Sequence, residues 1–228
     1  MSAAAAIAHP HGGGVLLAAG PAPEQARLTV ILVHGRGGGA RDILGLAAEL
    51  NQPEVAFLAP EARGATWYPQ SFLAPTAANE PGLSSGLRRL EEIAADLAAR
   101  GVPSERVALL GFSQGACLAL EFASRSDRRW AAVVAFSGGV IGPPGRSFEA
   151  AGDLRGTPVF LGCSDRDPHV PLARVEESAG LLRRLGAEVD QRIYPGMPHT
   201  INDDEIVAAR LLLEKAAAAL TAGQPAKP

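Results

Sequence analysis

Five short runs along the chain are apolar at every position rather than at alternate positions. They are residues 30–33, 55–58, 107–110, 131–136 and 158–161. Continuous apolar runs are expected of strands that are buried on both faces, as the strands of a parallel sheet are. Two weaker runs, residues 15–17 and 189–194, are predicted to be edge strands. We therefore expect a mostly parallel sheet of about seven strands.

The segments between the apolar runs carry the period of amphipathic helices. From residue 83 to residue 100, leucines recur on one face and charged residues on the other, and Gly101 supplies a stop. The last helix has a clear start, because Asn202 can act as its cap and three acidic residues follow in the first turn. This alternation predicts an α/β fold with helices on both faces of the sheet.

The length and composition restrict the domain organisation and the classes of function. The 228 residues show no repeat or interdomain linker, so we predict one domain over residues 15–221, with flexible tails at 1–14 and 222–228. A net charge of −3 argues against electrostatic binding of nucleic acid. No apolar run approaches the roughly 18 residues of a membrane span, and the first residues lack the basic region of a signal peptide. We therefore expect a cytoplasmic protein that is not integral to the membrane.

A Gly-x-Ser-x-Gly sequence at residues 111–115 separates the apolar run 107–110 from a helical stretch. This is the pattern of a nucleophile elbow, in which glycines flank a serine on a strained turn. A serine hydroxyl is a poor nucleophile at neutral pH and needs a general base that a third group orients. Ser113 therefore predicts an acid and a histidine later in the chain, in that order.

Candidates for both partners follow the later strands. His199 lies after the last predicted strand and directly before the last helix. Asp165 and Asp167 lie after the run 158–161, and either can be the acid while the other forms a turn with its own backbone. Ligands of open parallel sheets bind outside the carboxyl ends of the strands. We therefore expect these segments to meet at one edge of the sheet.

Three motifs together resemble the phospholipase/carboxylesterase family of α/β-hydrolases, which includes the acyl-protein thioesterases. They are Gly-Phe-Ser-Gln-Gly at 111–115, Asp-Pro-His-Val-Pro at 167–171 and Gly-Met-Pro-His-Thr-Ile at 196–201. The resemblance spans residues 29–213 and implies an α/β-hydrolase fold and hydrolysis of acyl esters or thioesters through an acyl-enzyme. It implies no metal or cofactor, and a monomer or homodimer. It also favours Asp167 as the acid, because the family's aspartate stands directly before Pro-x-Val-Pro.

Hydrolysis through an acyl-enzyme also needs fixed donors for the oxyanion of the tetrahedral intermediate. One donor is expected to be the backbone N–H that follows the nucleophile, which is that of Gln114. The other is expected from the glycine-rich loop 34–39, where the family resemblance implies the backbone N–H of Arg36, with no role required of its side chain. His34 is expected to anchor this loop rather than to act as a second base.

Candidates for the substrate pocket lie on the loops after the strands. The chain has no room for a large cap domain, so we expect a shallow, open site. The aromatic residues 67, 68 and 72 form either a pocket wall or packing for their loop, and residues 137–156 form either a flap or a surface excursion. His169 either borders the pocket or has an ordinary role in its loop. The substrate-binding candidates are Trp67, Tyr68, Phe72, Val140 and His169.

Two other classes of function also fit parts of the sequence. Gly35-x-Gly37-x-x-Ala40 fits the dinucleotide-binding fingerprint, and Glu61 near the next strand end could bind a ribose, as in an NAD(P)-dependent oxidoreductase. A non-catalytic binding protein with an α/β-hydrolase-like fold is the second. The dinucleotide hypothesis leaves the positions of Ser113, Asp167 and His199 unexplained, whereas the non-catalytic hypothesis predicts that a fluorophosphonate probe does not label the protein. Cys117 and Cys163 are predicted to be buried and non-catalytic, because no base is placed for them.

Overall fold

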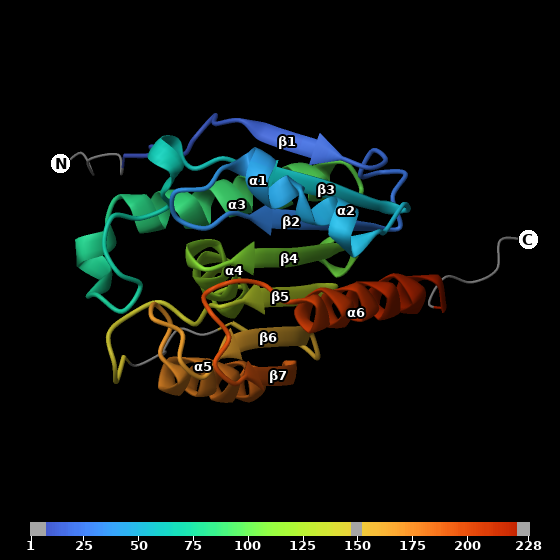
Figure 1. Ribbon diagram of the computed structural model, residues 1–228. Helices are drawn as coiled ribbons and strands as arrows, with labels where there is room; N and C mark the ends of the chain where they lie inside the picture. Colours follow the sequence, from blue (N-terminus) through green and yellow to red (C-terminus); the bar gives the residue numbers. More distant parts are fainter. Residues whose placement is uncertain (1–7, 147–151, 223–228) are drawn as a thin grey trace, which may run out of the picture.

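The computed structural model describes residues 8–146 and 152–222, and its centre is one sheet of seven strands in the order β1-β3-β2-β4-β5-β6-β7 (Figure 1). The strands are β1 (Leu16–Ala19), β2 (Leu28–Val33), β3 (Val55–Pro60), β4 (Val107–Phe112), β5 (Ala132–Phe136), β6 (Pro158–Ser164) and β7 (Glu188–Tyr194). Strand β1 pairs with β3 in antiparallel fashion, and all other neighbours are parallel. The predicted mostly parallel sheet is confirmed, with both weak runs at its edges.

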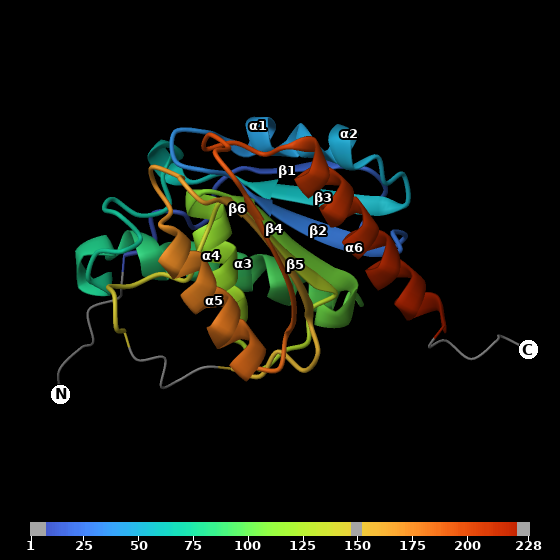
Figure 2. The ribbon, with the colours of Figure 1, turned by 60° about the horizontal axis from the view of Figure 1, so that its bottom comes forward.

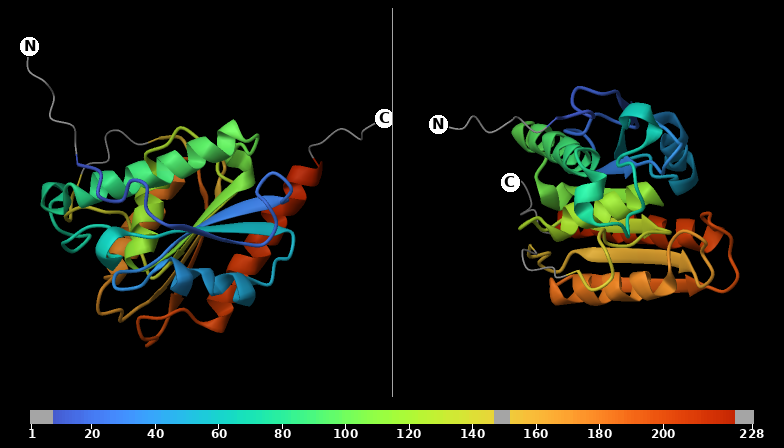
Figure 3. Two further views of the ribbon diagram at one scale, coloured as in Figure 1. Left: turned by 90° about the horizontal axis from the view of Figure 1, so that it is seen from above. Right: turned by 90° about the vertical axis from the view of Figure 1, so that its left-hand side faces the viewer.

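Helices cover both faces of the sheet, as the alternating pattern predicts (Figure 2). The helices are α1 (Ala40–Leu44), α2 (Leu46–Leu50), α3 (Gly82–Ala99), α4 (Gln114–Ser124), α5 (Leu172–Arg184) and α6 (Asp203–Ala222). Short 3₁₀ helices are η1 (Arg63–Ala65), η2 (Thr76–Asn79) and η3 (Ser104–Arg106). Helices α3, α4 and α5 lie on one face, and α1, α2 and α6 lie on the other. The twist of the sheet between these layers is visible from above (Figure 3).

Helix α6 begins where its cap predicts. The Asn202 side-chain oxygen accepts the Glu205 N–H at 2.9 Å, and the Glu205 carboxylate accepts the Asn202 N–H at 2.9 Å. This reciprocal pair is a capping box, which satisfies two donors that a helix start otherwise leaves without partners. It also fixes the point at which the preceding loop, which carries His199, enters the helix.

Part of the expected N-terminal tail is packed against the domain. His11 is only 3% exposed, and its Nε2 donates to the Trp67 carbonyl at 2.9 Å while its Nδ1 accepts the Arg63 N–H at 3.1 Å. The His9 ring lies 2.8 Å from the Ser85 hydroxyl on α3. Burial lowers the pKa of His11, so the neutral ring holds the loop after β3 through these two hydrogen bonds. Residues 1–7 and 223–228 lie outside the described residues.

Candidate active site

Ser113 occupies the sharp turn between β4 and α4. Its backbone has φ 54° and ψ −119°, a strained conformation for a residue with a Cβ, and one that is characteristic of a nucleophile elbow. Steric crowding excludes a side chain at both flanking positions. A Cβ on Gly115 would lie 2.0 Å from the Val33 carbonyl oxygen, and a Cβ on Gly111 would lie 2.4 Å from the Gly115 carbonyl carbon. The turn therefore requires glycine at both positions.

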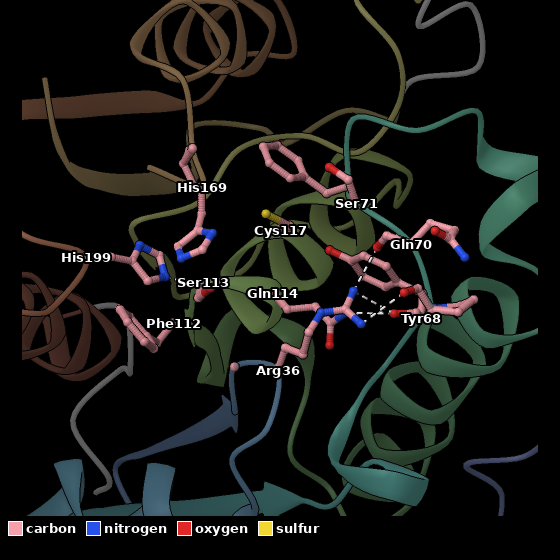
Figure 4. Close-up of a pocket in the computed structure, with 14 residues that line it drawn as sticks. Arg36, Tyr68, Gln70, Ser71, Phe112, Ser113, Gln114, Cys117, His169 and His199 are labelled. Atoms are coloured by element: carbon pink, nitrogen blue, oxygen red, sulfur yellow. Dashed lines mark hydrogen bonds between the residues drawn. The ribbon is translucent and has the colours of Figure 1, made fainter. Parts of the chain in front are cut away.

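The structure brings together the three side chains that the sequence singles out. His199 Nε2 lies 2.9 Å from Ser113 Oγ, and His199 Nδ1 lies 2.6 Å from Asp167 Oδ2. The three residues follow β4, β6 and β7, whose carboxyl ends lie along one edge of the sheet. Figure 4 shows the His199 ring turned toward Ser113 at the rim of a pocket.

The surroundings of Asp167 hold its carboxylate ionised. Its side chain is fully buried, and burial alone would raise its pKa. The hydrogen bond from His199 and the N–H groups of His169 and Val170, which donate to Oδ1 at 2.8 and 3.0 Å, outweigh burial and lower the pKa. Asp165, the other candidate, instead accepts the Gly196 N–H at 2.7 Å. The geometry therefore favours Asp167 as the partner of His199.

The backbone N–H groups of Arg36 and Gln114 are free to act as donors. Gln114 is the first residue of α4, and the first N–H groups of a helix have no acceptor within the helix. Across the described part of the chain, the Arg36 N–H has no backbone or side-chain acceptor. Its neighbour Gly35 packs against Ser113, because a Cβ at Gly35 would lie 3.4 Å from the serine Cβ. Both donors therefore belong to segments that adjoin Ser113.

The side chains of these two residues fasten the same loop. The Arg36 guanidinium donates to the carbonyls of Tyr68, Pro69 and Gln70 at 2.9, 3.0 and 2.7 Å (dashed in Figure 4). The Gln114 side-chain amide donates to the Tyr68 carbonyl at 2.8 Å, and its oxygen accepts the Trp67 N–H at 2.9 Å. The sequence predicts no such role for either side chain. A three-carbonyl clamp has no sequence signature, because its acceptors are backbone atoms.

His34 holds the start of the glycine-rich loop, in agreement with its predicted role. Its Nε2 accepts the Ala62 N–H at 3.0 Å, so the ring proton is on Nδ1, which donates to the Gly35 carbonyl at 2.7 Å. Burial lowers the pKa of this ring and keeps it neutral. Both ring nitrogens are engaged, and neither is available as a base.

A pocket of about 430 Å³ opens at Ser113 and His199. Of the predicted substrate-binding residues, Tyr68, Phe72 and His169 line it. Cys117, which the sequence analysis left outside the site, lines it as well. This position follows from helical spacing, because residues four apart share a face and Cys117 is four residues after Ser113. Burial raises the pKa of the Cys117 thiol to about 12, so it contributes a neutral wall and no nucleophile.

Trp67 and Val140 do not line this pocket, and their assignment to it is corrected. The Trp67 indole is fully buried, and its N–H donates to the His34 carbonyl at 2.9 Å. It packs the loop onto the core, which is the second of the two roles that the sequence left open for these aromatics. Val140 is also fully buried, and its N–H donates to the Ser178 hydroxyl at 2.9 Å.

The described part of the expected flap is tied to two helices. The buried Glu121 of α4 accepts the Ile141 N–H at 3.1 Å, and Arg174 of α5 donates to the carbonyls of Val140 and Gly142 at 2.9 and 2.7 Å. These contacts hold residues 137–142 in place, which disfavours a flap there. Residues 147–151 of the same segment lie outside the described residues.

The glycine-rich loop is poorly suited to a dinucleotide. Helix α1 has only five residues, and two carboxylates occupy its start: Glu61 accepts the Ala40 N–H at 3.2 Å and Asp42 accepts the Gly39 N–H at 2.8 Å. Glu61 is therefore not free for a ribose, and a pyrophosphate would meet negative charge instead of open N–H donors.

Within the described residues, no group of three or more His, Cys, Asp or Glu is arranged to hold a metal ion. None of the helices in the same part of the chain is long and apolar enough to cross a membrane.

Two solved structures are similar to this chain in sequence and in fold. The crystal structure of a phospholipase/carboxylesterase from Dyadobacter fermentans is 41% identical in sequence, with a TM-score of 0.85 over 89% of this chain and 97% of that chain. The structure of esterase PE8 is 30% identical, with a TM-score of 0.73 over 89% of this chain and 98% of that chain.

Among relatives in sequence, acyl-protein thioesterase 1 from Gibberella zeae is 27% identical over 220 residues, which cover 86% of this chain and 93% of that protein. The α/β-hydrolase fold predicted from the motifs is thus confirmed by solved relatives. The family model described as Phospholipase/Carboxylesterase matches residues 20–217. Since this match covers well over half of the sequence, the chain belongs to the phospholipase/carboxylesterase family.

Proposed function

We propose that this protein is a serine hydrolase of carboxylic acyl esters or thioesters, with Ser113 as nucleophile, His199 as general base and acid, and Asp167 as the orienting acid. The observation that carries the proposal is the continuous contact from Asp167 Oδ2 to His199 Nδ1 at 2.6 Å and from His199 Nε2 to Ser113 Oγ at 2.9 Å. Both distances lie within hydrogen-bond reach, as this chemistry requires.

Each side chain then has one task. The ionised Asp167 accepts a hydrogen bond from the Nδ1–H of His199, which leaves a lone pair on Nε2 facing the serine hydroxyl. As Ser113 Oγ attacks the acyl carbonyl carbon, its proton passes to Nε2. The negative charge that develops on the carbonyl oxygen is held by the N–H groups of Arg36 and Gln114.

Collapse of the tetrahedral intermediate gives an acyl-enzyme and a free alcohol or thiol. His199 donates the Nε2 proton to the leaving oxygen or sulfur as the bond to carbon breaks. A water molecule then occupies the place of the leaving group, His199 removes its proton, and the same steps release the carboxylic acid and the serine. No cofactor is needed for either half.

The pocket favours a small or extended acyl group. Apart from the reacting residues, its inner walls are Tyr68, Phe72, Cys117 and Val170, which offer apolar surface, and its volume is about 430 Å³. Pockets of this size bind compact ligands through apolar contact, with a few polar groups that set the orientation. Relatives named acyl-protein thioesterase support a thioester as one substrate, and the reacting groups serve oxygen esters equally well.

Hydrolysis of a graded series of p-nitrophenyl esters and matched thioesters tests the proposal. We expect Ser113→Ala to lower kcat by about 10⁴- to 10⁶-fold, as loss of a catalytic serine does in other serine hydrolases. Ser104→Ala is the matched control, because Ser104 lies in η3, which leads into β4 at the end opposite Ser113. Retention of most of the activity by Ser113→Ala would remove this serine from the mechanism.

A further inference from the structure

A second, smaller groove adjoins the proposed active site. It has a volume of about 280 Å³ and meets the larger pocket at Gly35, Arg36 and Phe112, which line both. Beyond this shared wall, its surface is largely apolar and comes from Ile43, Leu46 and Ile201. In Figure 4, Phe112 and Arg36 lie on one side of Ser113, and Cys117 of the larger pocket lies on the other.

An acyl-transfer site must accommodate two arms of its substrate. Once the carbonyl oxygen lies between the N–H groups of Arg36 and Gln114, the acyl chain and the leaving group extend in different directions from the carbon next to Ser113. The two hollows that meet beside Ser113 match this requirement. The larger hollow reaches the buried side chains Tyr68 and Cys117, which are 2% and 1% exposed, and so encloses the arm that stays on the enzyme.

The smaller groove lies beside the proton donor. The Phe112 ring packs on the His199 ring with centroids 5.0 Å apart, and Ile201 follows His199 by two residues. The leaving atom must receive its proton from His199 Nε2, so the arm attached to that atom extends past His199 and Phe112. That direction ends in the smaller groove.

The charges around this groove select against an anionic occupant. Asp42 is exposed and contributes a carboxylate to the lining. Arg36 also lines the groove, but its guanidinium points away from it toward the carbonyls of residues 68–70, so the carboxylate of Asp42 is the charge that faces an occupant. A leaving group that carries phosphate or carboxylate would therefore be repelled, whereas an uncharged alkyl or aryl group would bury apolar surface.

We propose that the groove formed by Ile43, Leu46, Phe112 and Ile201 is the leaving-group subsite, and that it takes an uncharged, apolar alcohol or thiol. This inference rests on the proposed function and deepens it, because it names the part of the substrate that each hollow receives. It excludes an alcohol or thiol with phosphate groups as a preferred leaving group.

Filling the groove tests the assignment. Leu46→Trp places a large side chain in the subsite, and Ala48→Trp puts the same residue on an exposed position of the same helix as a control. With the acyl group kept as butyrate, we expect Leu46→Trp to lower kcat/KM for 1-naphthyl butyrate about 10- to 100-fold relative to ethyl butyrate. Ala48→Trp should leave the ratio of the two esters unchanged. Leu46→Ser, which removes apolar surface without adding volume, should shift the ratio in the same direction by a smaller factor.

The kinetic step provides a second readout. Deacylation begins after the alcohol has left, so Leu46→Trp should leave kcat unchanged for any ester whose turnover is limited by deacylation. A uniform loss with both esters, or a changed dependence on acyl chain length at constant alcohol, would overturn the assignment. The proposed function has a separate test, because hydrolysis that disappears in Ser113→Ala supports it whatever Leu46→Trp does.

Two esters that differ in the charge of the leaving group test the selection against anions. Phenyl butyrate and 4-sulfophenyl butyrate have leaving groups of similar shape that differ in charge. We expect the wild-type protein to prefer phenyl butyrate about tenfold or more, and Asp42→Asn to narrow that preference, because asparagine keeps the acceptor for the Gly39 N–H and removes the charge. A preference that Asp42→Asn leaves unchanged would overturn the electrostatic part of the proposal.

Discussion

Substitution of Asp167 by asparagine should abolish most activity through a change of tautomer rather than a loss of shape. The Asp167 Oδ1 atom accepts two backbone N–H groups, from His169 at 2.8 Å and Val170 at 3.0 Å. An asparagine must offer its carbonyl oxygen to these donors, because an amide NH₂ group cannot accept them. Its NH₂ group therefore occupies the place of Oδ2, 2.6 Å from His199 Nδ1.

The amide would then donate to Nδ1, and the ring proton would move to Nε2. A protonated Nε2 donates to Ser113 Oγ and cannot accept its proton, so the general base is lost. In serine proteases the same exchange lowers kcat by about 10⁴-fold, which corresponds to about 5.4 kcal/mol of activation free energy. We expect a loss of this order in kcat/KM for p-nitrophenyl butyrate.

Asp165→Asn is the matched control, two residues away. Asp165 accepts the Gly196 N–H at 2.7 Å, and the asparagine oxygen can keep this bond. We therefore expect its kcat/KM to stay within about threefold of the wild-type value, since only a partly exposed charge is lost. Thermal unfolding of both variants checks that they are folded. The proposed role of Asp167 is refuted if Asp167→Asn retains more than a tenth of the activity while folded, or if Asp165→Asn is the more damaging change.

Three further predictions concern the loop clamp, the elbow and a buried acid. Arg36→Ala should lower kcat about 10- to 100-fold with a smaller change in KM, because the substitution releases three carbonyls and loosens an oxyanion donor. Arg36→Lys should not restore kcat. Steady-state kinetics that show only a change in KM would contradict the role of the guanidinium in holding this loop. In urea titrations, Gly115→Ala should lower the free energy of unfolding by more than about 3 kcal/mol. Gly180→Ala in α5 should raise the free energy of unfolding by up to about 1 kcal/mol, because the new Cβ would meet only Arg184 Nη1 at 3.6 Å. Equal effects of the two substitutions would contradict the steric requirement for glycine at residue 115. Burial raises the pKa of Glu205 from 4.5 to about 7, so the folded protein holds this proton after the unfolded chain has lost it. The free energy of unfolding should fall by roughly 3 kcal/mol as pH rises from 4.5 to about 7. Glu205→Gln should remove this fall in stability. If the stabilities of the wild-type and Glu205→Gln proteins change in parallel with pH, Glu205 is not the cause.

The strands could be predicted from the sequence because burial on both faces forces each of them to be apolar throughout. The run at residues 107–110 is an example, since β4 pairs with β2 on one side and β5 on the other. The start of α6 was equally predictable, because the Asn202 cap depends only on residues a few positions away. Features that depend on local sequence are the ones that a single chain reveals.

Features that depend on long-range backbone contacts were not predictable. Trp67 and Tyr68 are adjacent in a loop and both are buried, yet only Tyr68 lines the pocket. Their roles are set by acceptors on distant segments, such as the His34 carbonyl that binds the Trp67 N–H. His11 lies in an Ala- and Gly-rich stretch that predicts a tail, and its anchoring depends on a carbonyl and an N–H more than fifty residues away.

The most direct test of the central claim is the covalent reaction of Ser113 with a fluorophosphonate. We expect the wild-type protein to gain the mass of one phosphonyl group, which peptide mapping places on Ser113. Labelling and loss of esterase activity should proceed at the same rate. Ser113→Ala and His199→Ala should remain unlabelled on that timescale. A folded wild-type protein that stays unlabelled, or that is labelled at another residue as activity falls, would contradict the role of Ser113 as the nucleophile.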